Sequence, residues 1–312
     1  MPQRGVRYSL GAVFSILLFL GLAGCSRGQQ QPALPPQFLF VTMPATRTIE
    51  VFPANASGTT QPLGTVVEQQ PDLPVDLSVD FNGEIFVANA NGNVKVYGGR
   101  DFQYQLIRTV GGPHTGMAHL AGIAVDLSGS FYVSGSGPTL GQGQVTWFVA
   151  GLNGNVAPGR TISGPHTGLT NPGGIARDAS GRVFVVERSS NKVLVFDADA
   201  KDDAAPAITL GPFHSPQHVF VDQLLNIYVS SKGDDRITVL VPTGTETWSV
   251  NSAFTSSAMR DPEGVGSDAA GRIAVAVPDG ILFFGPNSNG ASDPVTRLSA
   301  SGLTKPTGLF IH

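Results

Sequence analysis

Four polar residues stand at positions where a repeated segment of this chain otherwise has small or apolar residues. Each repeat is marked by an aspartate. The position four residues before it is most often glycine, and the position five residues before it is otherwise Val, Ala, Gly or Thr. The exceptions with acidic, amide or imidazole side chains are Asp76, Gln217, His218 and Glu263. Two carboxylates and an imidazole held together can bind a cation or act as an acid and a base. Whether they meet depends on how the repeats are arranged.

The repeat is clearest in residues 171–200, where three short apolar runs are separated by turns. The tetrapeptide Asp178-Ala179-Ser180-Gly181 has the composition of a type I turn, with aspartate first and glycine last. No run reaches the length of a typical helix, so the segment predicts an antiparallel meander. The segment recurs with anchor aspartates at spacings of 46, 52, 44 and 46 residues, namely Asp80, Asp126, Asp178, Asp222 and Asp268.

Repeats of about 40 to 50 residues with four strands each are typical of a β-propeller. Fourth strands are predicted at residues 106–110, 160–162, 207–210 and 295–298. A sixth copy is split between the ends of the chain. Residues 305–312 supply its first strand, and residues 37–41, 48–52 and 63–67 supply the other three. The sequence therefore predicts an all-β, six-bladed propeller that is closed by pairing its two ends and leaves no long open sheet edge.

The repeat, for example LAGIAVDLSGSFYVSG from Leu120, resembles that of the NHL-repeat propellers over residues 37–312. It is also similar to a bacterial subgroup with Asn-, Gly-, Ala- and Pro-rich loops before the outer strand, here residues 153–158 and 289–294. The resemblance implies a six-bladed propeller. It does not identify a function, because propellers include enzymes, scaffolds and binding modules.

The first 36 residues have the composition of a targeting segment and a tether. Arg4 and Arg7 precede an apolar run at residues 10–22, which is shorter than the roughly 20 residues that span a bilayer. Residues 22–25, Leu-Ala-Gly-Cys, match the bacterial lipobox, which implies removal of residues 1–24 and lipidation of Cys25. The alternative is an ordinary cleaved signal with an incidental cysteine. Cys25 is the only cysteine of the chain and has no disulfide partner.

Residues 25–36 are predicted to be the lipidated N-terminus and a flexible, Pro-containing tether. By resemblance to Gram-negative lipoproteins, Ser26 after the cysteine favours the outer membrane, on its periplasmic or its surface side. We therefore expect a bacterial cell-envelope protein held at the membrane by its N-terminal lipid. The net charge of −4 and the absence of a basic block argue against nucleic acid as a partner.

Strand direction assigns the loops to two faces. Loops entering each first strand share a face, the top, with the loops between second and third strands. The aspartate turns lie on the opposite face, the bottom, where the tether enters at Gln37. We therefore expect the lipid to hold the bottom towards the membrane and to leave the top face outward.

The top loops hold a second group of candidates. The segment Gly-Pro-His-Thr-Gly occurs twice, and a shorter relative precedes a third histidine. The candidate residues of these top-face loops are His114, His166, His214, Glu187 and Arg188. Three histidines on adjacent blades suggest a metal site. The alternative is a repeated crossing loop in which Pro and Gly set the path and Thr and His satisfy backbone groups.

The mouth of the central channel, with Asp76, Gln217, His218 and Glu263, is the stronger candidate. Asp76 and His218 belong to opposite blades, and Glu263 belongs to the blade next to His218. Amidating and streptogramin-type lyases of similar build place several histidines here, and gluconolactonase-like propellers use Glu, Asn and Asp on a divalent ion. The chain lacks a full set for either, and calcium usually takes six to eight oxygens. We therefore expect no metal and no cofactor.

These observations favour a non-catalytic binding or scaffold module whose top face takes a protein or a small molecule. The alternative is a metal-dependent hydrolase or lyase, lactonase-like or streptogramin-lyase-like, at the channel mouth. A third possibility is a sugar- or polymer-binding surface protein, for which only Trp147 and Trp248 are available as stacking platforms.

Overall fold

The computed structural model describes residues 37–137, 141–300 and 302–312. The predicted signal peptide (residues 1–24) and the lipidated tether (residues 25–36) lie outside the described residues. Within the described ranges the regular structure is β-strand, apart from the two short 3₁₀ turns η1 (Pro113–Thr115) and η2 (Pro165–Thr167). None of the helical segments described is both long and apolar enough to cross a membrane.

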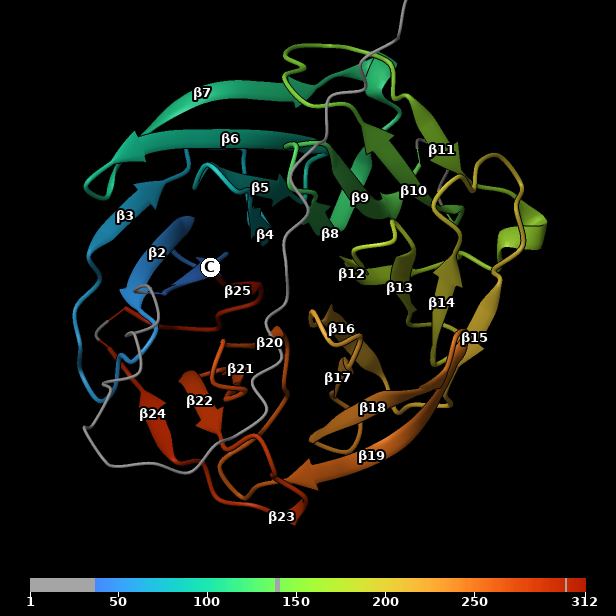
Figure 1. The fold of residues 1–312 in the computed structure, drawn as a ribbon. Helices are drawn as coiled ribbons and strands as arrows, with labels where there is room; N and C mark the ends of the chain where they lie inside the picture. The colour runs from blue at the N-terminus through green and yellow to red at the C-terminus, as the bar shows by residue number, and fades with distance from the viewer. Residues whose placement is uncertain (1–36, 138–140, 301) are drawn as a thin grey trace, which may run out of the picture. The chain divides into compact units, whose positions relative to one another are not determined.

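The strands form six antiparallel sheets, or blades, that we number along the chain (Figure 1). Blade 1 contains β25 (Leu309–Ile311), β1 (Phe38–Met43), β2 (Thr48–Pro53) and β3 (Gly64–Val67). Blade 2 contains β4 (Pro74–Val79), β5 (Ile85–Asn89), β6 (Asn93–Arg100) and β7 (Gln103–Gly111). Blade 3 contains β8 (Ala118–Val125), β9 (Phe131–Ser136), β10 (Gly143–Phe148) and β11 (Arg160–Ile162).

The remaining blades follow the same order from the axis outward. Blade 4 contains β12 (Pro172–Arg177), β13 (Val183–Glu187), β14 (Lys192–Phe196) and β15 (Ile208–Leu210). Blade 5 contains β16 (Pro216–Val221), β17 (Ile227–Ser231), β18 (Arg236–Gly244) and β19 (Thr247–Thr255). Blade 6 contains β20 (Val265–Ser267), β21 (Ile273–Val277), β22 (Gly280–Phe284) and β24 (Thr296–Leu298). The first strands surround the axis, which confirms the predicted six-bladed β-propeller (Figure 1).

The anchor aspartates hold the turns between first and second strands. Asp80 Oδ1 accepts hydrogen bonds from the backbone N–H groups of Asn82 and Glu84, each at 2.9 Å. The carboxylates of Asp126, Asp178, Asp222 and Asp268 accept backbone hydrogen bonds in the equivalent turns. The repeated aspartate of the sequence thus has a structural role, since its carboxylate accepts hydrogen bonds from the backbone N–H groups that a tight turn leaves unpaired.

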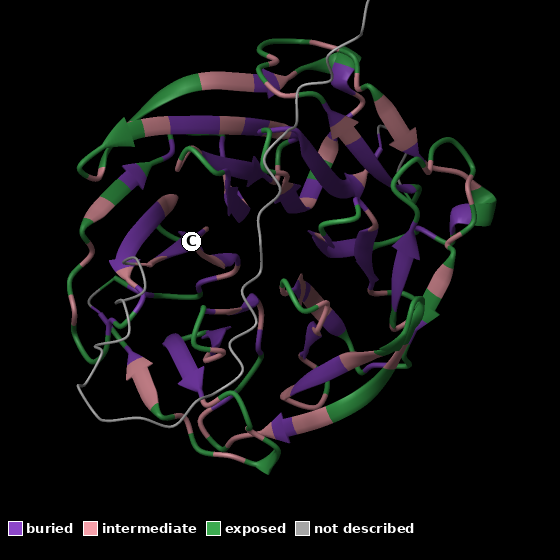
Figure 2. Ribbon diagram, viewed as in Figure 1, coloured by how far each residue is buried: buried purple, intermediate pink, exposed green. Residues whose placement is uncertain are grey.

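Packing between blades forms the core. The buried apolar side chains fall into six clusters, and each cluster joins two neighbouring blades. Leu39 and Phe52 of blade 1, for example, pack with Phe283 of blade 6, and all three side chains are fully buried. Burial is concentrated in the middle strands, while the outer strands carry the exposed residues (Figure 2). Each blade therefore depends on both of its neighbours for its apolar contacts.

The two ends of the described chain close the ring as predicted. Leu39 of β1 pairs with Ile311 of β25, and the backbone N–H of Phe38 donates to His312 O at 2.8 Å. The Oγ1 of Thr307 donates to the carbonyl oxygen of Val75 at 2.8 Å and so ties this strand to blade 2. Burial lowers the pKa of the His312 imidazole at the end of the strand.

Neighbouring blades are also joined at the circumference by what we call bridging loops. In four blades the loop between third and fourth strands pairs with the outer strand of the preceding blade. The paired residues are Gly58 with Leu298, Gly154 with Val110, Asp202 with Ile162, and β23 (Gly290–Ala291) with β19. These include the two Asn- and Gly-rich loops singled out in the sequence.

Blades 2 and 5 have long hairpins instead of bridging loops. No such pairing joins blade 2 to blade 1, or blade 5 to blade 4, among the residues described. Aromatic contacts cover these two seams, since Phe102 packs on Phe38 with ring centroids 5.1 Å apart and Trp248 on Phe184 at 5.9 Å. The bridging loops therefore divide the propeller into two half-rings, blades 2 to 4 and blades 5, 6 and 1.

Candidate functional site

The channel mouth is a cavity of about 190 Å³ between the starts of the first strands. It brings together the four polar residues proposed for it, Asp76, Gln217, His218 and Glu263. The other lining residues are Val75, Leu120, Ala121, Arg188, Gly264, Thr307 and Gly308. The cavity thus draws residues from both half-rings.

Asp76 lies on β4, is only 1% exposed, and has one engaged carboxylate oxygen. Its Oδ2 accepts the backbone N–H of Ile123 at 2.9 Å. Its Oδ1 is buried without a hydrogen-bond partner. Space for this oxygen depends on Gly308, because a Cβ at that position would lie 2.4 Å from it. The recurring glycine at this position is therefore a requirement for close approach.

His218 faces Asp76 across the axis. Its Nε2 lies 3.6 Å from Asp76 Oδ1, and its side chain is 14% exposed. Its Nδ1 is buried without a hydrogen-bond partner. A Cβ at Gly174 would lie 2.6 Å from the imidazole, so this glycine makes room for the ring. The mouth is therefore narrow enough for side chains of opposite blades to meet.

Arg188, predicted from the sequence as a candidate of a top-face loop, follows β13 in such a loop and also lines the channel mouth. Its Nη1 donates to the carbonyl oxygen of Pro172 at 3.5 Å, and its Nε is buried without a partner. It forms no ion pair within the described residues. Burial lowers the pKa of its guanidinium, against the opposing effect of nearby carboxylates, of which Glu263 is the largest contributor. The group still carries a positive charge at neutral pH.

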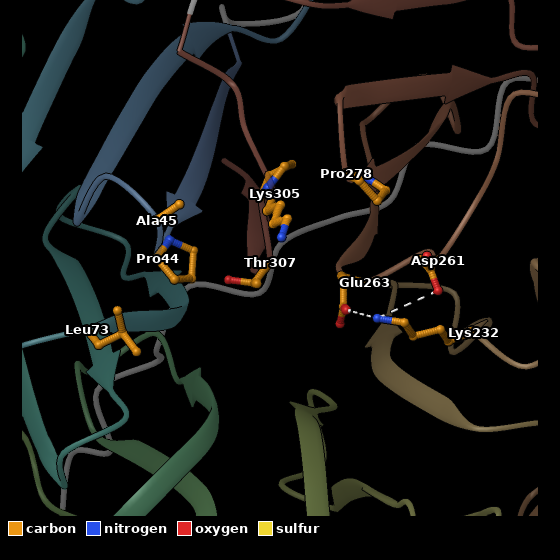
Figure 3. A pocket seen from close by; sticks show the side chains of 10 residues that line it. Pro44, Ala45, Leu73, Lys232, Asp261, Glu263, Pro278, Lys305 and Thr307 are labelled. Atoms are coloured by element: carbon orange, nitrogen blue, oxygen red, sulfur yellow. Dashed lines mark hydrogen bonds and ion pairs between the residues drawn. The ribbon is translucent and has the colours of Figure 1, made fainter.

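Glu263 lines both the mouth and a larger top pocket of about 530 Å³, and Figure 3 shows the top pocket. Lys232 Nζ lies 2.9 Å from Glu263 Oε1 and 3.8 Å from Asp261 Oδ1. The hydrogen bond to Glu263 raises the pKa of Lys232. The other residues that line the top pocket are Pro44, Ala45, Leu73, Pro278, Lys305, Pro306 and Thr307. Glu263 thus has a lysine as its partner, whereas Asp76 Oδ1 accepts no hydrogen bond.

Glu187 does not belong to the surface of a top loop, which corrects the sequence assignment. It is the last residue of β13, and its side chain is 0% exposed. Its carboxylate accepts hydrogen bonds from Thr170 N and Oγ1, from Asn171 N and from Ser189 N. Glu187 therefore holds the loop that enters β12, a role that its position at a strand end did not reveal.

The three loop histidines lie on separate exposed loops. Thr115 and Thr167 are buried, and the Oγ1 of each donates to the glycine carbonyl three residues earlier, as expected for a crossing loop. The backbone N–H of His114 donates to Asn155 Oδ1, and His166 Nδ1 pairs with Asp203 Oδ2 at 2.6 Å. His214 Nδ1 lies 3.3 Å from Asp234 Oδ2. Each histidine contacts a different neighbour.

The described residues contain no group of three or more His, Cys, Asp or Glu placed to hold a metal ion. What the mouth offers is an arginine without an ion pair, a carboxylate oxygen without a donor, and an imidazole nitrogen without a partner. Buried polar groups are normally hydrogen-bonded, because an unpaired one costs about 1–3 kcal/mol. The arrangement is suited to binding a small polar molecule.

Comparison with known proteins gives the same fold and nothing finer. No protein family profile matches the chain, and no curated protein matches it in sequence. Among solved structures, a protein of unknown function from Bacteroides caccae superposes with a TM-score of 0.65 at 11% identity, covering 88% of this chain and 98% of that one. The likeness is one of fold.

Two further structures are similar to the same extent. A functionally unknown protein from Desulfotomaculum acetoxidans gives a TM-score of 0.61 at 12% identity, covering 88% of this chain and 98% of its own. The periplasmic gluconolactonase PpgL of Pseudomonas aeruginosa gives 0.61 at 13% identity, covering 88% and 99%. Identities this low leave the function to be inferred from the site itself.

Proposed function

We propose that this NHL-like propeller is a cell-envelope lipoprotein that binds a small hydroxylated carboxylate at its channel mouth without transforming it. The observation that carries the proposal is Arg188, whose Nε is buried and unpartnered and which has no ion pair among the described residues. A guanidinium binds a carboxylate through charge-assisted hydrogen bonds. The carboxylate of the ligand would be the ion-pair partner of Arg188.

The other polar residues of the mouth are suited to accept hydrogen bonds from hydroxyl groups of the same ligand. Asp76 Oδ1 accepts no hydrogen bond, and Gln217, from the opposite blade, lines the same cavity. The Nε2 of Gln217 donates to Ser215 O at 2.9 Å, which leaves its amide oxygen as an acceptor. A carboxylate oxygen and an amide are the usual partners of hydroxyl donors. The volume of about 190 Å³ limits the bound part to a small molecule, and the adjoining top pocket leaves space for a longer one.

Calorimetric titration of the purified protein with gluconate, and with glucose as its neutral counterpart, tests this proposal. Gluconate should bind and glucose should not. Arg188→Gln should weaken gluconate binding about ten- to a hundredfold, since a hydrogen bond to a charged group is worth about 1.5–3 kcal/mol. Arg100→Gln, at the exposed tip of the β6–β7 hairpin, is the matched control. Equal binding by wild type and Arg188→Gln would exclude the assignment.

The anchoring part of the proposal rests on the Leu-Ala-Gly-Cys sequence and on the single cysteine. Wild-type protein should partition into detergent, and its mass should show loss of residues 1–24 and the addition of acyl chains. Cys25→Ser should yield soluble protein or an uncleaved precursor, because each buried acyl CH₂ contributes about 0.8 kcal/mol to membrane binding. Mature wild-type protein with a free thiol in the soluble fraction would contradict lipidation.

The enzyme alternative is tested on the same protein. One fold neighbour is a gluconolactonase, so a panel of lactones and esters belongs with titrations of Ca²⁺, Mg²⁺ and Zn²⁺. We expect no turnover, and the double variant His218→Ala, Glu263→Ala should keep its stability within about 1 kcal/mol. Micromolar metal binding and turnover that are both lost in this variant would instead establish a metal-dependent hydrolase or lyase.

A further inference from the structure

The three most exposed large apolar side chains of the described chain lie at the same kind of turn. They are Leu127 at 81% exposed, Leu224 at 76% and Phe81 at 74%. Each lies between the first and second strands of its blade, directly after the anchor aspartate or one residue later. Equivalent turns of a ring end at a common level, so these side chains mark a plane across the bottom face rather than a groove.

The tips of all five complete turns lack charge. The two residues that follow each anchor aspartate are exposed. They are Phe81 and Asn82, Leu127 and Ser128, Ala179 and Ser180, Gln223 and Leu224, and Ala269 and Ala270. Beside two of the tips, Arg182 Nε pairs with Asp178 Oδ2 and Arg272 Nε with Asp268 Oδ2, each at 2.7 Å. The carboxylates of Asp80, Asp126 and Asp222 accept backbone hydrogen bonds of their own turns. Five uncharged turn tips on one face, three of them with large exposed apolar side chains, form a surface suited to contact with an apolar partner.

The connection to residues 1–36 is made at this same face. Gln37 takes the place of the missing sixth turn, and its side-chain oxygen accepts the backbone N–H of Ala269, a tip residue of blade 6, at 3.0 Å. Twelve residue steps separate Gln37 from Cys25, so their reach is at most about 40 Å. A lipid on Cys25 would therefore keep Gln37, at the bottom face, within about 40 Å of the bilayer.

We propose that the bottom face of the propeller rests on the membrane and that Phe81, Leu127 and Leu224 insert among the lipid headgroups. The proposal rests on the lipid anchoring proposed above. Three single side chains give weak binding on their own, but a tether converts their insertion into an intramolecular step with a high effective concentration. Interfacial apolar groups typically enter about 5–10 Å, which suits side chains at turn tips.

The test uses lipidated full-length protein in vesicles of phosphatidylethanolamine and phosphatidylglycerol. Because the lipid occupies the thiol of Cys25, one introduced cysteine is the only site for an environment-sensitive fluorophore. Ala269→Cys places the probe on the bottom and Ser190→Cys places it on an exposed top loop. We expect a blue-shifted emission at residue 269 that lipid-borne quenchers reduce, and a water-like, unquenched emission at residue 190.

A triple variant then identifies the contact. Phe81→Ser, Leu127→Ser and Leu224→Ser together should abolish quenching at residue 269 while the protein stays in the vesicle fraction. The matched control replaces Val67, Leu106 and Val250, exposed apolar residues of the outer strands, by serine and should retain quenching. A vesicle-bound protein with equal, water-like emission at both probes would overturn membrane seating, and failure to bind vesicles would instead refute the anchor. Self-association in detergent that the triple variant removes would assign this face to a second copy and also overturn the proposal.

Discussion

At the scale of single residues, the carboxylates divide into those that hold turns and those that remain available. Asp178 Oδ1 accepts the N–H of Arg182 at 2.9 Å, and its Oδ2 accepts the Nε of the same residue at 2.7 Å. Burial raises the pKa of this carboxyl, but the hydrogen bonds from Ser180 and Arg182 outweigh burial and lower it from the usual 3.8. Asp76, by contrast, keeps one oxygen unpaired in the channel mouth.

Replacement of Asp178 by alanine should therefore destabilise the propeller by about 1–3 kcal/mol, the cost of leaving buried donors unpaired. A carboxyl whose pKa is lowered on folding stabilises the protein above its unfolded pKa and loses this contribution as the pH falls through the lower folded value. The difference in unfolding free energy between wild type and Asp178→Ala should thus shrink below about pH 4. Denaturant titrations between pH 7 and pH 3 measure it. Asp199→Ala, at an exposed loop, should change stability little at either pH.

The polar first-strand residues of the channel mouth could be predicted from the sequence, because small or apolar residues at the same positions of the other blades make each larger polar replacement visible. Arg188 was expected on a top-face loop, but its place in the cavity wall could not be predicted, because a residue after a strand end looks like any solvated turn residue until the ring brings it to the axis. Glu187 was also misjudged, since burial of a strand-end carboxylate depends on the loop of residues 170 and 171 that folds over it. Contacts between blades have no local signature in a sequence.

At the scale of elements, the ring depends on the pairing of β25 with β1. Deleting residues 305–312 removes the innermost strand of blade 1 and the buried Leu309, and exposes β1 as an open edge. The truncated chain should melt at a much lower temperature and aggregate. Leu309→Ala, which keeps the strand, should cost about 2–5 kcal/mol and leave the protein monomeric. Thermal unfolding monitored by light scattering distinguishes the truncated chain from the Leu309→Ala variant. An unchanged melting temperature after truncation would show that closure of the ring does not depend on this strand.

Element boundaries were predictable where strands are buried on both faces and less so at the rim. The fourth strand of blade 5, β19, was not predicted, because its sequence TWSVNSAFT has only one buried residue and lacks an apolar run. β7 in blade 2 has the same burial pattern and was predicted only in its apolar second half. Outer strands are held by their neighbours more than by their own composition.

At the scale of the whole molecule, the bridging loops leave two seams on opposite sides of the ring. The outer strands β3 and β15 end the half-rings there and have no bridging loop on their outer edges within the described residues. Native-state hydrogen exchange should therefore be faster in β3 and β15 than in β11 and β24, whose edges are bridged. Equal protection of all four strands would show that the bridging loops do not set the stability of the rim.

The division into half-rings also bears on the channel mouth. Asp76 and Arg188 belong to blades 2 and 4, while His218 and Glu263 belong to blades 5 and 6, so the two walls of the cavity come from different half-rings. A molecule bound between these walls would contact both half-rings and hold them together across the axis. It would stiffen both seams at once, although each lies at the circumference and far from the bound atoms. Binding in the small central cavity would then reduce the opening of the two seams at the outer rim.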